Sequence, residues 1–216
     1  MNASPRRHEG KPVLRGFLHE LSFGVAVSAG VLLVAAAPGV AKVGCGLYAA
    51  SLAGLFGVSA LYHRPFWTEP ARSWLRRVDH SAIFVLIAGT STPLALTLPS
   101  PLGARMLAVV WAGAALGIAR ALFFPRARRW VAVLMAVALG WSAAAYLPAL
   151  MAMNGRTVIV LLALGGVLYS LGALAYALRR PDPWPRVFGY HEVFHALVVI
   201  AALCHFTAIA LTLPAG

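Results

Sequence analysis

The chain has 216 residues, of which 61% are hydrophobic and 11% are charged, and its formal net charge is +12. This composition is more apolar and less charged than that of soluble proteins, so it excludes a soluble domain as the body of the protein. A strongly positive charge is typical of proteins that bind nucleic acid and of proteins that contact a membrane surface, so these two classes of partner must be distinguished.

Seven apolar runs of 21 to 23 residues dominate the sequence, and each is long enough to cross a bilayer as a helix. They are rich in Ala, Leu, Val and Gly and lack the alternation of a membrane β-barrel. We therefore predict an all-α fold, a seven-transmembrane helix bundle. The runs form one membrane domain over 17–213, with spans at 17–37, 42–63, 79–99, 104–124, 130–150, 157–178 and 190–212.

The segments that precede and connect the first runs are polar or aromatic. Residues 1–16 are basic, and we expect them to form a cytoplasmic tail. The run that follows resembles a signal peptide, but it is longer than a signal sequence's apolar region and six more runs follow, so we expect a retained helix. The connection 64–78 contains two prolines and three aromatic residues. It predicts a short interfacial helix anchored by Trp67 and Trp74.

The basic residues are distributed unevenly between the two sides of this predicted bundle. Of the 18 Lys and Arg residues, 15 fall on the side of the N-terminus, and only Lys42, Arg105 and Arg156 fall on the other. Positive charge is retained on the cytoplasmic side, so the N-terminus is predicted inside and the C-terminus outside. We expect a multi-pass membrane protein, with membrane lipids as its surroundings and no nucleic-acid partner.

Polar residues that hydropathy does not explain gather at one depth of the predicted membrane. The second run ends with a Ser and a His one turn apart, the third begins with an Asp, and the seventh begins with two His one turn apart. In the topology derived from the arginines, all of these ends are cytoplasmic. The five residues are Ser59, His63, Asp79, His191 and His195.

The three histidines of this group have the chemistry of a metal site. His191 and His195 share a helix face and can chelate one ion, and His63 would supply a third nitrogen. Three ligands and an open fourth position are typical of catalytic zinc, which lowers the pKa of its bound water to about 7. Asp79 would accept a proton or orient a ligand, and Ser59 would donate a hydrogen bond to the substrate.

Simpler interpretations of the same residues remain open. Two histidines at a helix end are also common at membrane interfaces, and a Ser in a span often bonds to its own helix. Asp79 is equally placed to cap its helix or to pair with Arg76 or Arg77. The combination favours function, because ionisable groups inside a membrane are costly and usually functional.

The remaining ionisable residues are weaker candidates. His205 follows His191 by roughly 21 Å of helix, at about 1.5 Å per residue, so it is expected to be a hydrogen-bonded core residue. We expect His80 to face a loop and Glu192 to be a helix-start or interfacial charge. Glu20 lies at the depth of the cluster and is a further candidate member.

Three stretches of the sequence match a known family, namely "SALYH" (59–63), "DHSAIFVLIAGTSTPLAL" (79–96) and "HEVFHALVVIAALCH" (191–205). They resemble the hemolysin III family of bacterial proteins, which is related to the progestin and adiponectin receptors and remotely to alkaline ceramidases. The resemblance implies a location in the bacterial inner membrane. The resemblance implies one zinc ion held by His63, His191 and His195, with Asp79 beside the zinc-bound water and Ser59 nearby. Many relatives also carry a His in the first helix, and here we expect Phe23 in its place.

These observations lead to one main functional hypothesis and two alternatives. The main one is a zinc-dependent hydrolase of lipid amides or esters, similar to a ceramidase. The first alternative is a pore-forming or membrane-perturbing protein, as the family name suggests. The second is a receptor-like membrane protein in which zinc only holds helices together.

Overall fold

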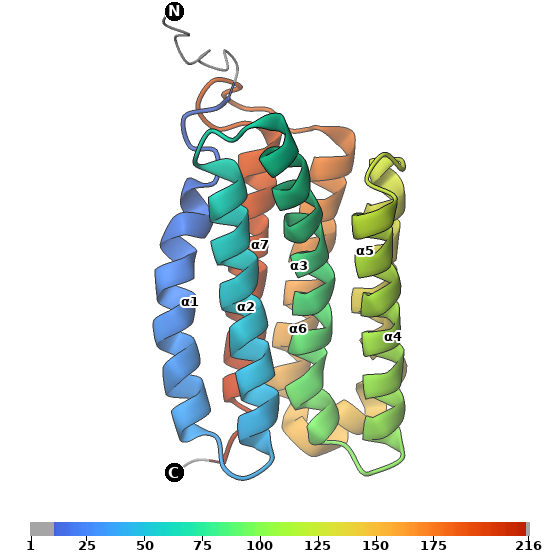
Figure 1. Ribbon diagram of the computed structural model, residues 1–216. Helices are drawn as coiled ribbons and strands as arrows, with labels where there is room; N and C mark the ends of the chain where they lie inside the picture. The colour runs from blue at the N-terminus through green and yellow to red at the C-terminus, as the bar shows by residue number, and fades with distance from the viewer. Residues whose placement is uncertain (1–10, 215–216) are drawn as a thin grey trace, which may run out of the picture.

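The computed structural model describes residues 11–214, and all the secondary-structure elements in this part of the chain are helices (Figure 1). Within it are seven α-helices and one 3-10 segment, which confirms the all-α prediction. The elements are α1 (Phe17–Ala36), α2 (Ala41–His63), α3 (Glu69–Leu96), α4 (Leu102–Phe123), α5 (Arg129–Trp141), η1 (Ser142–Tyr146), α6 (Leu147–Leu178) and α7 (Tyr190–Ala210).

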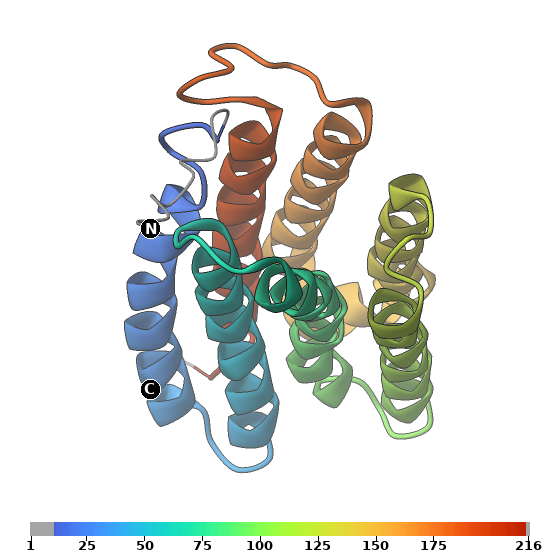
Figure 2. The ribbon, with the colours of Figure 1, turned by 45° about the horizontal axis from the view of Figure 1, so that its top comes forward.

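Successive helices run in alternating directions, so α1, α3, α5 and α7 all begin at the same end of the bundle (Figures 1 and 2). The most extensive contacts join α1 to α2, α2 to α3, α3 to α4, and α6 to α7. Helix α7 also contacts α1 and α3. The end where α2 finishes and α3 and α7 begin, at the top of Figure 1, is called the site end below.

The packing is that of a helical membrane bundle. The interior contains fully buried side chains such as Tyr48, Phe84 and Met106, whereas large apolar residues such as Leu32 and Leu116 are exposed on the outside. By length and composition, α1, α2, α4, α7 and the 50-residue stretch Arg129–Leu178 are long and apolar enough to cross a membrane. An exterior of this kind is suited to lipid, since hydrocarbon is as apolar as these side chains.

Helix α3 differs from its prediction because it starts ten residues earlier, at Glu69. The separate interfacial helix expected within 64–78 is wrong: residues 69–78 are the first turns of α3 itself. Pro70 lies in the first turn, where a proline is well accepted, and no residue interrupts the helix between it and Asp79. As a result, Asp79 lies inside a continuous helix and is not its first residue.

The predicted span 130–150 is also interrupted. Helix α5 ends at Trp141, a 3-10 turn follows, and α6 starts at Leu147. Gly155 then breaks α6 with φ 80° and ψ 170°, a conformation that glycine reaches without steric cost. The chain therefore reverses direction through 142–155 at the end opposite the site, and the helical stretch that follows, 156–178, agrees with the predicted span 157–178 to within one residue.

Candidate metal centre

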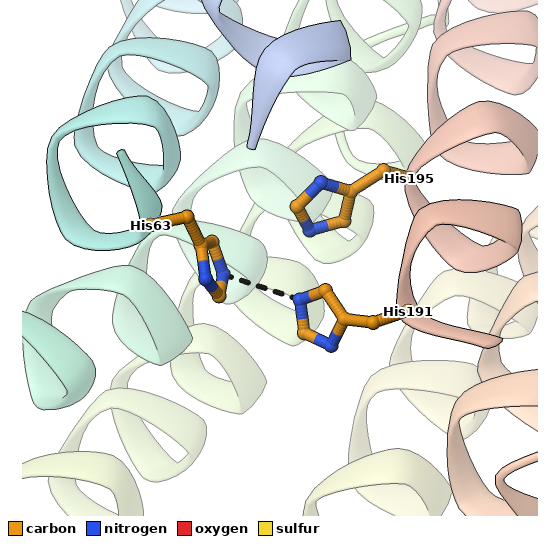
Figure 3. A group of neighbouring side chains, drawn as sticks. All are labelled: His63, His191 and His195. Carbon is orange, nitrogen blue, oxygen red and sulfur yellow. Dashed lines mark hydrogen bonds between the residues drawn. The ribbon is translucent and has the colours of Figure 1, made fainter. Parts of the chain in front are cut away.

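Three histidines from two helices meet at the site end. His63 is the last residue of α2, while His191 and His195 lie one turn apart in the first turns of α7. One nitrogen of each ring lies within 4.8 Å of the others, and the Nε2 atoms of His63 and His191 are 3.2 Å apart. Figure 3 shows the three rings facing a common space between α2 and α7. The structure thus brings together the three residues selected from the sequence.

This arrangement fits a tetrahedral metal. Two nitrogens bound to zinc at about 2.0–2.1 Å in tetrahedral geometry are about 3.3 Å apart, close to the 3.2 Å between His63 and His191. Without an ion, two ring nitrogens at that distance require one to carry a proton, whereas a cation accepts both lone pairs. His63 and His195 are buried and His191 is partly buried, so the cluster is shielded from solvent. These residues can hold one metal ion.

Asp79 and Ser59 lie beside the histidines. Ser59, one turn before His63 on α2, is 2% exposed, and Asp79 on α3 is 9% exposed. The Ser59 hydroxyl donates a hydrogen bond to the Asp79 carboxyl group. Both residues line the same cavity as the three histidines. A carboxyl group, a hydroxyl group and three imidazoles therefore face one space.

Asp79 forms no ion pair with Arg76 or Arg77, contrary to one of the alternatives considered above. The Arg76 guanidinium donates to the Pro125 carbonyl at 3.0 Å, and the Arg77 guanidinium donates to the Leu122 carbonyl at 3.0 Å. Both arginines therefore cap the end of α4. The Asp79 carboxyl group remains available to whatever occupies the cavity.

His19 on α1 is a member of the site that the sequence reasoning missed. Its ring stacks on that of His195, with 3.8 Å between centroids and 5° between planes, and Phe56 lies 5.0 Å away. The residue is 2% exposed, and neither ring nitrogen has a hydrogen-bond partner in the described part of the chain. Because the rings are parallel, their lone pairs do not converge on one point, so in this geometry His19 is a neighbour of the ligand set and not a fourth ligand.

The expectation that Phe23 replaces a first-helix histidine is therefore corrected. Phe23 is 43% exposed, whereas His19 occupies the site one turn earlier. The signal was available in the sequence: His19 precedes Glu20, which the arginine-based topology had already placed at the depth of the cluster. Glu20 itself does not join the site, because it pairs with Arg64 at 2.7 Å and is half-exposed.

A buried ion pair fixes the beginning of α1 against the beginning of α7. The Arg15 guanidinium donates to the Glu192 carboxylate at 2.5 Å, and Glu192 is 1% exposed. The other Glu192 oxygen accepts the Gly189 backbone N–H at 2.9 Å, so the third residue of α7 caps the beginning of its own helix. Glu192 is thus a helix-start charge as expected, but it is buried and paired and not interfacial.

Backbone geometry lets α1 approach the site closely. Gly16 precedes α1 with φ 79°, and a Cβ at this position would lie 2.6 Å from the His63 Cβ. The backbone N–H groups of Val13 and Leu14 donate to the Arg186 and Val187 carbonyls of the connection before α7. Residues 1–10 of the predicted tail lie outside the described residues. The segment 11–16 therefore covers the site end and connects α1 to α7.

Two other histidines lie outside the cluster. His205 bonds through its Nε2 to the Leu162 carbonyl at 3.1 Å and contacts the Tyr169 ring edge-on, as expected for a core histidine. His80 lines the cavity, so the expectation that it faces a loop is wrong. It follows Asp79 on α3, and the helix continues on both sides of it.

The cavity beside the histidines has a volume of about 930 Å³. It begins among the histidines and Asp79 and continues past apolar side chains to the far part of the bundle. Its lining includes Arg72 and Leu94 of α3, which are separated by roughly 33 Å of helix at about 1.5 Å per residue. The cavity is therefore polar at the site end and apolar along most of its length.

Positive charge dominates the polar end of the cavity. Lys11, Arg15 and Arg72 all line it. Burial lowers the pKa of Lys11, and the positive charges of Arg15, Arg72 and Arg64 lower it further. The polar end of the cavity is thus a region of concentrated positive charge beside the metal-binding cluster.

Comparison with known proteins places this geometry in a family. The family model described as "Haemolysin-III related" matches residues 8–206. The "Hemolysin-3 homolog" of Bacillus subtilis (strain 168) is 32% identical over 154 residues, which cover 71% of this chain and 69% of that protein. "Hemolysin-3" of Bacillus cereus is 38% identical over 124 residues, covering 56% of this chain and 53% of the relative.

A more distant likeness is confined to a short segment. The "Adiponectin receptor protein" of Drosophila melanogaster is 49% identical over 53 residues, which cover 22% of this chain and 12% of that protein. The family model, in contrast, includes α1 to α6 and most of α7, with all the histidines of the site. The chain is a helical membrane protein that belongs to the haemolysin-III-related family.

Proposed function

We propose that the protein is a zinc-dependent hydrolase of lipid amides or esters in the bacterial plasma membrane. His63, His191 and His195 are the metal ligands, and the chain crosses the membrane seven times with its N-terminus in the cytoplasm. The observation that carries the proposal is the buried cluster of three imidazoles, whose nitrogens lie within 4.8 Å of one another at the polar end of a long cavity.

The residues around the cluster have the functional groups that hydrolysis needs. Zinc held by three imidazoles lowers the pKa of a coordinated water and polarises a carbonyl group. Asp79, buried and free of ion pairs among the described residues, accepts the proton that the attacking water loses and returns it to the leaving group. Ser59 orients the Asp79 carboxylate through its hydroxyl group.

The cavity supports a lipid as the substrate. Its volume of about 930 Å³ is at the upper end of the range of small-molecule sites, and apolar residues such as Leu86, Leu150 and Val198 line its deeper part. An acyl chain placed there would remain in apolar surroundings while its carbonyl carbon reached the polar end. This division matches an amphipathic substrate whose reactive bond lies at the head of the chain.

The distribution of charge supports the proposed orientation. Helices α1, α3, α5 and α7 begin at the site end, and the connections and helix ends there contain 13 of the 16 Lys and Arg residues described. The opposite end has Lys42, Arg105 and Arg156. The positive-inside rule then makes the site end cytoplasmic.

A substrate panel tests this function. The purified protein, loaded with zinc, is incubated with lipid amides and lipid esters, and released fatty acid is measured for the wild type and for Asp79→Asn. We expect release from at least one class, dependent on zinc and lost in the variant. Stoichiometric zinc with no release from any lipid would favour a structural metal. Liposome leakage that persists after all three histidines are replaced would favour pore formation.

A further inference from the structure

Three arginines and one histidine line the cavity next to the proposed catalytic residues. Arg76, Arg77 and His80 come from α3, and Arg120 comes from the last turn of α4. His80 lies close enough to Arg76 and Arg120 to interact with both electrostatically. These four residues are called the mouth cluster.

No carboxylate in the described part of the chain neutralises the mouth cluster. Three acidic residues form ion pairs with cations outside the cluster, one accepts a backbone N–H, and Asp79 is bonded to Ser59. The four acidic residues other than Asp79 have partners outside the mouth cluster, which are Arg15 for Glu192, Arg64 for Glu20, Arg72 for Glu69, and the Tyr190 N–H for Asp182.

The arginines of the cluster are held in place but retain unused donors. Arg77 donates to the Leu122 carbonyl, and Arg120 donates to the carbonyls of Ala127 and Arg128. The Nε atoms of Arg77 and Arg120 are buried and have no hydrogen-bond partner among residues 11–214. A guanidinium has five N–H donors, and a buried donor without an acceptor is costly. Two fixed guanidiniums with unpaired donors therefore indicate that an anionic acceptor belongs there.

Membrane topology alone does not explain this placement. Arg126 and Arg128 lie in the same connection between α4 and α5, and both are exposed and outside the cavity lining. They satisfy the positive-inside rule equally well. Placing Arg77 and Arg120 in the cavity wall, where desolvation is costly, requires a further reason.

We propose that the mouth cluster binds the phosphate of an anionic phospholipid, whose acyl chains occupy the apolar part of the cavity. Arginine suits this role because its planar fork matches phosphate oxygens with two parallel hydrogen bonds. A free phosphate would use the same donors, but only the lipid also fills the apolar length of the cavity. This inference rests on the proposed function, because it identifies anionic phospholipids as the class of substrate for the same site.

The position of the cluster relates this ligand to the reaction. Arg76 precedes Asp79 by three residues on α3, so a phosphate held there lies about one helical turn from the proposed base. In a phospholipid a short glycerol link separates the phosphate from the ester carbonyls. Hydrolysis would add water to an ester carbonyl carbon and break its bond to the glycerol oxygen, which takes a proton, releasing a fatty acid and a lysophospholipid.

Binding can be measured independently of hydrolysis. The purified full-length His191→Ala protein, without added metal, is titrated in detergent with phosphatidylglycerol, with phosphatidylcholine of the same acyl chains, and with inorganic phosphate. We expect phosphatidylglycerol to bind at least about tenfold more tightly than either of the other two, equivalent to about 1.4 kcal/mol. The double change Arg77→Gln with Arg120→Gln should remove this preference, and the matched change Arg126→Gln with Arg128→Gln should leave it intact.

The outcomes separate this inference from the proposed function. Equal affinity for the two lipids, or inorganic phosphate binding as tightly as phosphatidylglycerol, would overturn it, as would loss of the preference in the Arg126 and Arg128 control. If the cavity variant does not fold, competition between the two lipids on the His191→Ala protein still decides the question. If the protein binds phosphatidylglycerol selectively but never hydrolyses lipid, the inference holds and the proposed function fails. If it releases fatty acid in a zinc-dependent way but does not prefer phosphatidylglycerol, the proposed function holds and the inference fails.

Discussion

The buried pair between Arg15 and Glu192 provides a quantitative test of how the site is held together. The change Glu192→Gln removes the negative charge but retains an oxygen that can accept the Gly189 N–H. Glu192 is 1% exposed and Arg15 is 20% exposed, so the guanidinium is left with little access to water. Breaking one side of a buried ion pair costs about 3–5 kcal/mol, and the retained cap places the expected cost near 3 kcal/mol.

The pair between Arg64 and Glu20 is a matched control on the same side of the bundle. Its partners are 41% and 50% exposed, and exposed pairs contribute about 0–1 kcal/mol. For a chain of this length, each kcal/mol lowers the melting temperature by about 2–4 °C. Glu192→Gln should therefore lower it by roughly 6–12 °C, and Glu20→Gln by at most about 4 °C.

Thermal unfolding of the two variants in detergent, followed by circular dichroism at low and high salt, makes this comparison. Salt should remove the small effect of Glu20→Gln and leave that of Glu192→Gln, because screening acts mainly on exposed charges. Equal shifts for the two variants would refute the reasoning that burial of the α1–α7 pair is what stabilises the site end.

Three further predictions concern the site and the core. His19→Phe preserves the stack on His195 and should retain the wild-type zinc content measured by mass spectrometry, since the parallel rings exclude His19 as a ligand; loss of zinc would show that it is one. Asp79→Asn should also retain zinc while lipid hydrolysis falls by about 10²–10⁴-fold, and an unchanged rate would remove Asp79 from the mechanism. Gly165→Ala directs a Cβ into the His205 ring and should cost about 1–3 kcal/mol in thermal unfolding, whereas Gly54→Ala, which meets open space, should be neutral or stabilising; equal costs would contradict this packing.

The elements that follow from hydropathy were predictable from the sequence, while those that depend on local breaks were not. Apolar runs located α1, α2, α4 and α7 to within two residues at either end. The start of α3 at Glu69 was missed because its first turns are polar and carry arginines, so hydropathy falls while the helix continues. The end of α5 at Trp141 was missed because the apolar run continues through the 3-10 turn and into α6, so hydropathy does not mark the break, whereas Gly155 falls in the connection predicted between 150 and 157.

The sequence predicted those members of the site whose depth in the membrane follows from the distribution of charge. It did not predict the member whose identification depends on the direction of its side chain. The distribution of arginines placed Ser59, His63, Asp79 and the α7 histidines at one level, and the structure brings them together. Depth alone did not separate His19, which points into the bundle, from Glu20, which points out to Arg64. The rotation of a helix about its axis depends on packing against its neighbours, and a hydrophobic run that is apolar on all sides does not reveal it.

The metal content of the purified protein tests the central claim most directly. Zinc per chain is measured for the wild type, for His63→Ala, His191→Ala and His195→Ala, and for His205→Ala as a control that removes a cavity histidine outside the cluster. The account predicts one zinc per chain in the wild type and in His205→Ala, and a large loss in each of the other three. A wild type that binds no zinc, or a His191→Ala variant that retains a full equivalent, would contradict it.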